Sequence, residues 1–196
     1  VRVCVLSDGV NTLAARQATG DLPATVTVLP SQAGSGDEGT AMLEIVYDMA
    51  PGASLFFATG FGGVASMATN IQSLAAAPYN CNIIVDDVTY LNEGAFQDGP
   101  IAQAVNTVTA SGVLYFSSAA NSGHLTRSES GTYEGDFVAS PNAIPAVIQS
   151  AYGAATPIQL HAFGAANYTT LTAVPGSTVR VSLKWSDALG ASANDY

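Results

Sequence analysis

The sequence has few basic residues. Its 196 residues include five Lys and Arg against fifteen Asp and Glu, which gives a formal net charge of −10. The cations are scattered from Arg2 to Lys184 and form no patch. A protein that follows nucleic-acid phosphates needs clustered positive charge, so we expect no nucleic-acid partner. No apolar run approaches the roughly 20 residues that a membrane-spanning helix requires, so we expect no membrane partner.

Cysteine and histidine are also scarce, with two of each. Cys4 and Cys81 both lie in apolar, strand-like runs, and we interpret them as two small buried residues rather than a disulfide. Neither has the spacing of a zinc ligand, and no D-x-[DN]-x-[DN]-G calcium loop occurs. We therefore expect no cofactor and no metal. A structural calcium ion has only scattered candidate ligands, namely Asp136, Asp187 and Asp195.

Apolar residues make up 48% of the chain and charged residues only 10%, a balance that excludes a disordered protein. Residues 1–118 alternate between short continuous apolar runs, typical of strands buried in a parallel sheet, and helical segments. This alternation predicts a doubly wound α/β fold. The expected strands are Val1–Leu6, Thr25–Leu29, Ser54–Ala58, Cys81–Val85 and Val113–Phe116. The expected helices are Asn11–Thr19, Asp37–Met49, Val64–Ala77 and Ile101–Ser111.

The pattern changes after about residue 125. Residues 126–145 contain Gly, Ser and Pro without a helical period, so we expect a connecting loop between an α/β portion (1–125) and a β-rich segment (146–196). That segment resembles the start of a β-sandwich or jelly roll with too few strands to close its sheets. Because native proteins cover open sheet edges, we expect the remainder of the polypeptide or another copy of the chain to complete it. Its expected strands are Val147–Tyr152, Ile158–Ala162, Tyr168–Ala173 and Val179–Trp185.

Polar residues follow several of the strands, at the edge where open α/β sheets carry their sites. Asp8 follows the first strand, either as a functional acid or as a turn or helix cap. Asp86 and Asp87 follow the fourth strand and point to opposite faces in extended backbone, so only one of them can enter a given site. The candidates after the fifth strand are Ser117, Ser118 and Asn121.

Glu38 begins the second predicted helix. At 100° per residue it shares a stripe with Met42, Ile45 and Met49, which we take as the buried side. A carboxylate there costs free energy unless it is paired or used, so we interpret Glu38 as functional. The alternative is an acid that stabilises the helix dipole.

Two sequence motifs give negative results. Residues 34–39 match G-x-G-x-x-G, but they follow the second strand and contain two acids that would repel a pyrophosphate. We therefore expect no dinucleotide site. The chain also contains no G-x-S-x-G nucleophile elbow.

Three blocks, in this order, resemble a subtilisin-like serine peptidase (subtilase). Val3-Cys4-Val5-Leu6-Ser7-Asp8-Gly9 resembles the aspartate block of that family. Glu38-Gly39-Thr40-Ala41, with Ala50-Pro51-Gly52-Ala53 further on, resembles the histidine block and its sequel. The run from Gly112 to Gly123 resembles the strand and loop that carry the oxyanion asparagine. Together the blocks span roughly residues 1–125.

The chain departs from the subtilase pattern at three points. The Asp-Ser order is inverted, so Asp8 falls one residue late. Glu38 stands at the catalytic-histidine position, which is similar to the sedolisins, whose Ser–Glu–Asp set favours acid. Sedolisins have Asp at the oxyanion position, whereas this chain has Asn121. The Gly-Thr-Ser block with the nucleophile is absent, so the resemblance puts the serine beyond Tyr196.

The resemblance implies a subtilisin-like fold and the amino-terminal part of a secreted bacterial serine endopeptidase, inactive as this chain alone. Glu38 would be the general base, Asp8 would orient it or share its proton, and Asn121 would stabilise the oxyanion of a peptide substrate. The residues expected to bind substrate are Asp86, Asp87, Ser117 and Ser118. The alternative is a non-catalytic extracellular protein on the same scaffold, used for binding or for assembly into oligomers or filaments.

Overall fold

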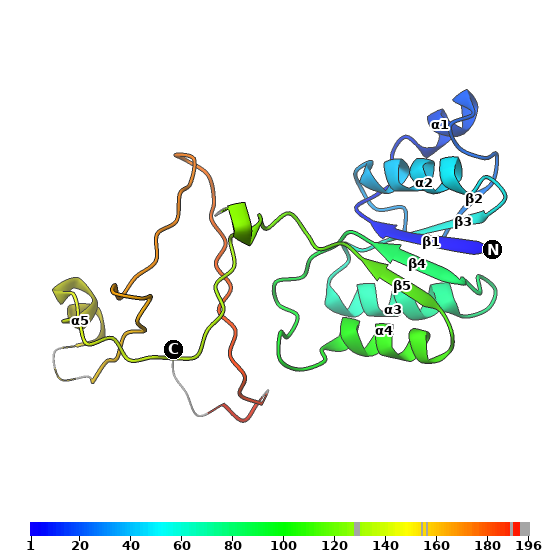
Figure 1. Cartoon of the computed structure of the whole chain (residues 1–196). Coiled ribbons are helices and arrows are strands. Elements are labelled where there is room, and N and C mark those ends of the chain that lie inside the picture. The colour runs from blue at the N-terminus through cyan, green and yellow to red at the C-terminus, as the bar shows by residue number, and fades with distance from the viewer. Residues whose placement is uncertain (128–129, 154, 156, 189, 193–196) are drawn as a thin grey trace. The chain divides into compact units, whose positions relative to one another are not determined.

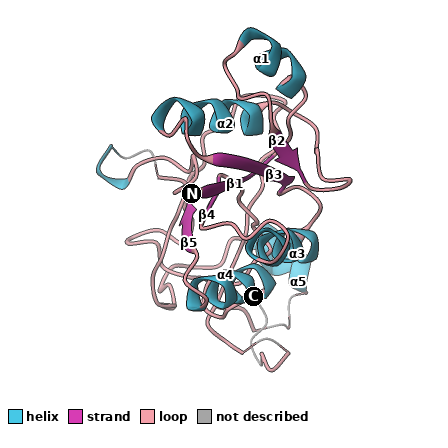
Figure 2. Ribbon diagram, turned by 90° about the vertical axis from the view of Figure 1, so that its right-hand side faces the viewer, coloured by secondary structure: helices cyan, strands magenta, loops and turns pink. Residues whose placement is uncertain are grey.

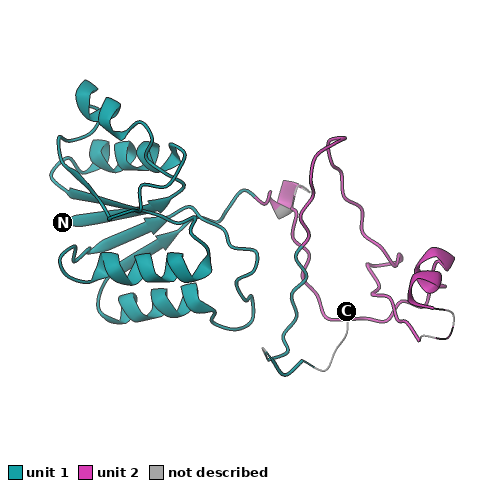
Figure 3. Ribbon diagram, turned by 180° about the vertical axis from the view of Figure 1, so that it is seen from behind, with its two compact units in different colours: residues 1–121, 182–196 teal, residues 122–181 magenta. Residues whose placement is uncertain are grey.

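The computed structural model describes residues 1–127, 130–153, 155, 157–188 and 190–192 (Figure 1). Its contacts divide the chain into two compact units, one of residues 1–121 and 182–196 and one of residues 122–181 (Figure 3). Asp195, a candidate calcium ligand, lies outside the described residues. Among the helices of the described part, none has both the length and the apolar character that a bilayer crossing needs.

The first unit is built on a five-stranded, all-parallel sheet in the order β2-β3-β1-β4-β5. β1 lies at the centre, with β3 on one side and β4 on the other. The predicted α/β fold with a parallel sheet is confirmed, and each strand lies within two residues of its expected bounds. The strands are β1 (Arg2–Ser7), β2 (Val26–Val28), β3 (Ser54–Thr59), β4 (Ile83–Asp86) and β5 (Leu114–Ser117).

Helices cover both faces of this sheet. α1 (Leu13–Thr19) and α2 (Glu38–Met49) lie on one side, and α3 (Val64–Ala75) and α4 (Pro100–Ala110) on the other (Figures 1 and 2). Alternate residues of β1 enter two separate cores, as the period of a strand requires. Val3 and Val5 pack with Leu43, Leu55 and Phe57 beneath α2. The core beneath α3 and α4 contains Cys4, Leu6, Met67, Ile71, Ile84 and Val108.

One crossover of the sheet differs in hand from its neighbours. The β2–α2–β3 and β4–α4–β5 connections step in the same direction across the sheet, but their helices cover opposite faces (Figure 1). The two connections therefore have opposite hands, and β3–α3–β4 shares the hand of β4–α4–β5. Because about 98% of such connections are right-handed, β2–α2–β3 is the left-handed exception. It is also the connection that carries Glu38.

The predicted buried side of α2 is wrong. Ile45 and Met49 are 63% and 83% exposed, and Glu38 itself is exposed. The buried residues are Gly39, Thr40 and Leu43, one position further around the helix. Gly39 explains the offset, because a Cβ at this position would overlap the ring of Phe57, and its absence lets α2 approach β3 closely.

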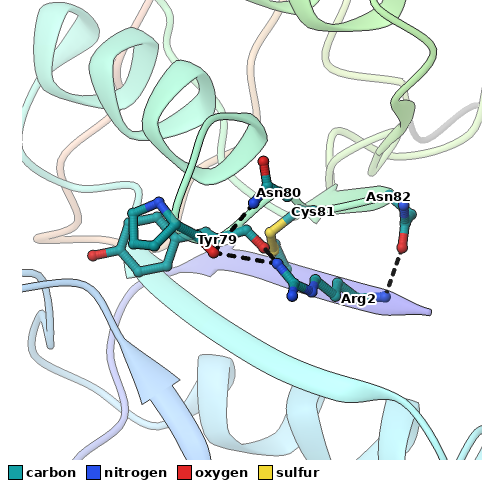
Figure 4. The surroundings of a disulfide bond; sticks show 7 residues. Arg2, Tyr79, Asn80, Cys81 and Asn82 are labelled. Atoms are coloured by element: carbon teal, nitrogen blue, oxygen red, sulfur yellow. Dashed lines mark hydrogen bonds between the residues drawn. A yellow bond between two sulfur atoms is a disulfide. The ribbon is translucent and has the colours of Figure 1, made fainter.

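The interpretation of the cysteines as unpaired is also wrong. Cys4 and Cys81 are buried as expected, but they form a disulfide with 6.1 Å between their Cα atoms (Figure 4). The α3 crossover returns the chain beside β1, so a residue 77 positions away becomes a neighbour of Cys4. Arg2 reinforces this junction, because its guanidinium donates to the carbonyl oxygen of Tyr79 at 2.6 Å and its backbone N–H to Asn82 Oδ1 at 2.9 Å.

The second unit contains a helix where a strand was expected. Val147–Tyr152 lies within α5 (Ala146–Tyr152), which follows Pro145 and ends at Gly153 with a φ of 92°. The described residues of the other expected segments form no strand, and the isolated bridges in this part of the chain join Ala139 to His161 and Phe163 to Ala166. The predicted jelly roll is therefore not shown by the described residues. The physical reason is that apolar segments without a partner strand gain no ladder hydrogen bonds or cross-strand contacts.

The disulfide gives a prediction about stability. Replacing Cys4 and Cys81 by Ala should lower the free energy of unfolding by about 2–4 kcal/mol, because a cross-link over a long loop restricts the unfolded chain. Urea unfolding with and without a reducing agent measures this loss. The double variant is the control, since reduction should leave its midpoint unchanged. A wild-type midpoint that does not move on reduction would contradict the prediction.

Candidate acid–base site

Three carboxyl groups gather at the carboxyl edge of the sheet, where β1 and β4 end and α2 begins. Asp8 follows β1, Asp87 follows β4, and Glu38 is the first residue of α2. The charges of Asp87 and Asp8 both act on Glu38. Asp8 and Glu38 therefore lie near each other, as the sequence predicted. Asp87, which the sequence assigned to substrate binding, lies beside them.

Asp8 connects the end of the central strand to the start of α2. Its Oδ1 accepts the backbone N–H groups of Gly9 at 2.5 Å and Gly39 at 3.1 Å. Its carbonyl oxygen accepts the N–H of Ser35 at 3.1 Å and the hydroxyl of Thr59 at 2.9 Å. The cap expected for Asp8 was of the segment that follows it, whereas this carboxylate satisfies an N–H group in the first turn of α2 that has no partner inside that helix.

The glycines of the G-x-G-x-x-G motif let the loop before α2 pack directly against Asp8. A Cβ on Gly34 would overlap the carbonyl oxygen of Asp8, and a Cβ on Gly36 would overlap its carboxylate. Both glycines also have positive φ, 67° and 127°. Packing against Asp8 therefore explains Gly34 and Gly36 of the G-x-G-x-x-G motif, while its third glycine, Gly39, packs against Phe57.

Asp87 has the largest effect on the ionisation of Glu38. Its Oδ2 accepts the hydroxyl of Ser7 at 3.0 Å. The charge of Asp87 raises the pKa of Glu38 above its usual value, with smaller contributions from desolvation and from the charge of Asp8. The two aspartates therefore favour the protonated form of Glu38 over the charged one.

The neighbouring Asp37 has a structural role. The backbone N–H of Thr12 donates to Asp37 Oδ1 at 2.7 Å, and this bond holds the pKa of Asp37 below its usual value. The hydroxyls of Thr12 and Thr40 donate to the same oxygen at 2.9 and 3.0 Å. Asp37 therefore ties the segment before α1 to the first turn of α2.

Asp86 lies on the opposite face from Asp87, as the alternation of an extended strand predicts. It is buried, and burial raises the pKa of its carboxyl. Its Oδ2 accepts the hydroxyl of Tyr115 at 2.6 Å, and its Oδ1 accepts the hydroxyl of Ser117 at 2.9 Å and the N–H of Val88 at 3.2 Å. These donors favour the charged form and partly offset the cost of burial.

The remaining candidates do not join the three carboxyl groups. Ser118 is exposed, and its backbone N–H donates to the carbonyl oxygen of Asp86 at 3.0 Å. Asn121 is exposed and follows Ala120, which has a φ of 61°. Within the described ranges, no hydrogen bond links Asn121 to Glu38, Asp8 or Asp87. No group of three or more Cys, His, Asp or Glu in the described part of the chain could hold a metal ion.

Sequence reasoning did not single out Tyr115 or assign a role to Ser7. The signal for Tyr115 was present, because Tyr115 and Ser117 lie two residues apart on β5, and Ser117 pairs with Asp86 in the β4–β5 register. Ser7 and Asp87 carried no such signal, because their contact depends on β1 and β4 being neighbours.

Searches against models of known protein families, against curated proteins and against solved structures found no match for this chain. The class that the fold and the site define is therefore an α/β protein with a carboxyl cluster at the carboxyl edge of a parallel sheet.

The carboxyl cluster gives a prediction about titration. Asp87→Asn should lower the pKa of Glu38, because removing the nearest negative charge makes ionisation of Glu38 easier. Asp8→Asn should lower it by less. Carbon-detected NMR of the Glu38 carboxyl over acid pH measures both shifts. Asp48→Asn, an exposed change on the same helix, is the control and should leave this pKa unchanged.

The Asp86 cluster gives a prediction about stability. Tyr115→Phe should raise the pKa of Asp86 further and cost about 1–3 kcal/mol at neutral pH, because it removes a donor from a buried carboxylate. The loss should shrink as pH falls through the pKa of Asp86, since the neutral acid needs this donor less.

Urea unfolding of this variant at several pH values measures the loss. The control is Tyr79→Phe, because the hydroxyl of Tyr79 makes no hydrogen bond within the described part of the chain. A loss of equal size at acid and neutral pH would contradict the role given to Asp86.

Proposed function

We propose that this chain is the acid–base part of a secreted serine endopeptidase with a subtilisin-like fold. The single observation that carries the proposal is that the charges of Asp87 and Asp8 raise the pKa of Glu38, at the edge where α/β folds hold their sites. The resemblance of three ordered sequence blocks to subtilases supports it. The Cys4–Cys81 disulfide supports secretion, because such bonds persist in oxidising compartments.

The mechanism is acyl transfer from a peptide to water. A serine hydroxyl from a segment outside these 196 residues attacks the peptide carbonyl, and Glu38 takes its proton. Glu38 then gives the proton to the leaving amine, and water repeats the cycle on the acyl-enzyme. Asp87 holds the second proton site and orients Glu38, while Asp8 adds negative charge nearby. Asn121 is proposed as the donor to the oxyanion.

Ser7, which contacts Asp87, does not replace that nucleophile. Ser7 donates to Asp87, but it is 0% exposed and cannot reach a substrate carbonyl. A segment that completes the site has a surface to cover, because Leu114 and Phe116 of the edge strand β5 are 57% and 55% exposed. They lie on the same sheet face as Ile83 and Val85, beside the part that α2 covers.

The proposal predicts an acidic pH optimum. A protein that continues past Tyr196 into the nucleophile segment should cleave peptides best at about pH 4–5, because a carboxyl pair with one proton works as base and acid only in the acid range. Glu38→Gln should abolish cleavage, while the control Asp48→Asn on the same helix should retain it. The measurement is hydrolysis of a fluorogenic peptide over pH, and full activity of Glu38→Gln would refute the proposal. This chain alone should hydrolyse nothing.

A second candidate function is assembly without catalysis. Large apolar side chains of the second unit are exposed, among them Val147, Tyr168, Val174 and Val181. Burial of such groups drives association, and an oligomer would provide the partner strands that the unit lacks. Light scattering after size-exclusion chromatography tests this candidate. A monomer at micromolar concentration would count against it.

A further inference from the structure

We infer that the cleft beside Asp86 binds the positively charged side chain of a lysine or arginine. The cleft has a volume of about 310 Å³ and lies where β4 and β5 end, on the sheet face that α3 and α4 cover. Its walls combine apolar side chains (Met67, Val88, Ile101 and Val105) with two carboxyl groups, those of Asp86 and Glu93. An alkyl chain that ends in a cation matches this combination.

Glu93 supplies the observation that points to a ligand. Its Oε1 accepts the backbone N–H groups of Ile101 and Ala102, at 3.0 and 3.2 Å, in the first turn of α4. Its Oε2 is buried and has no hydrogen-bond partner in the described structure. Capping of α4 therefore accounts for Oε1 of Glu93 but gives Oε2 no donor. Burial of an oxygen without a hydrogen bond costs free energy, which a ligand donor would recover.

The charges around the cleft favour a cation over a neutral donor. No Lys, Arg or His lines it. The ammonium group of Lys184 donates to the backbone carbonyl oxygen of Glu93, so it does not satisfy the carboxylate. Asp86 contributes a second negative group whose donors are all neutral hydroxyl or amide groups. A ligand cation would offset both carboxylates.

The position of the cleft links it to the acid–base site. Asp86 and Asp87 are consecutive residues that face opposite sides of the sheet, so one strand end borders the cleft on one face and carries the Asp87 charge that acts on Glu38 on the other. That the cation belongs to a peptide rests on the proposed function. The preference of the cleft for a cation does not, because it follows from the lining residues alone.

The test compares two blocked tripeptides on the wild-type chain. One is acetyl-Ala-Ala-Lys-amide, and the other replaces Lys by norleucine, which keeps the alkyl chain and removes the charge. Calorimetry should give a dissociation constant at least about tenfold lower for the lysine peptide, because hydrogen bonds to charged groups are worth that factor or more. In NMR spectra, the amides of Ile101 and Ala102 should shift on binding. Equal dissociation constants for the two peptides would overturn the inference.

A variant series identifies the residue responsible. Glu93→Gln keeps an acceptor for α4 and removes the charge, so it should abolish the preference for lysine. Glu134→Gln removes the same charge from an exposed site in the other unit and should retain the preference. A Glu93→Gln protein that folds, as judged by circular dichroism, and still prefers lysine would overturn the inference. The wild-type comparison decides the question where this variant does not fold.

Glu38→Gln separates this inference from the proposed function. It should leave the tenfold preference unchanged, because Glu38 does not line the cleft. Loss of the lysine preference in Glu38→Gln would overturn the assignment to the cleft. Failure to hydrolyse any peptide, with the preference intact, would refute the peptidase and leave the binding site standing.

Discussion

The carboxylate of Asp8 is the junction on which the rest of the site depends. Asp8 directly follows the central strand β1, and its Oδ1 accepts the N–H of Gly39 in the first turn of α2. α2 lies close to Asp8 and to β3 because three glycines lack side chains at the contacts. Gly34 and Gly36 of the preceding loop lie against Asp8, and Gly39 of α2 lies against Phe57. This contact places Glu38 beside Asp87, since β1 and β4 are neighbours. A side chain added at Gly34 or Gly36 would overlap Asp8, and one added at Gly34 or Gly39 would also overlap side chains of β3.

The charges that act on Glu38 are negative, namely those of Asp87 and Asp8. In the described residues, Arg16 forms ion pairs with Asp21 and Glu44, and its charge acts on the neighbouring Asp37 rather than on Glu38. Negative charges placed around Glu38 make its ionisation less favourable, so this arrangement does not itself stabilise the fold. Other parts of the same unit stabilise the fold against this repulsion. They are the two hydrophobic cores on either face of β1 and the disulfide that joins β1 to the residues just before β4.

Local pattern predicted the parts of this protein that local forces determine. The strands and helices of residues 1–118 follow from continuous apolar runs and helical periods, and the opposite orientations of Asp86 and Asp87 follow from the pleat of a strand. The Cys4–Cys81 bond and the contact of Ser7 with Asp87 required the order of the strands, which no local pattern encodes. The buried side of α2 was missed because a glycine, which carries no hydrophobic signal, set it. Val147–Tyr152 has the residues of a strand but no partner strand, and it forms a helix.

The end of β4 borders two different groups of residues. Asp87 raises the pKa of Glu38, while Asp86 lies on the face that α3 and α4 cover and borders a cleft with a second carboxylate. Because the backbone between them is a single extended step, neither side chain can change sides without moving the other. A ligand cation that fixes Asp86 would therefore also fix the backbone of Asp87, and with it the position of Asp87 relative to Glu38. Recognition and proton transfer would then be coupled through one peptide unit, without any motion of the sheet.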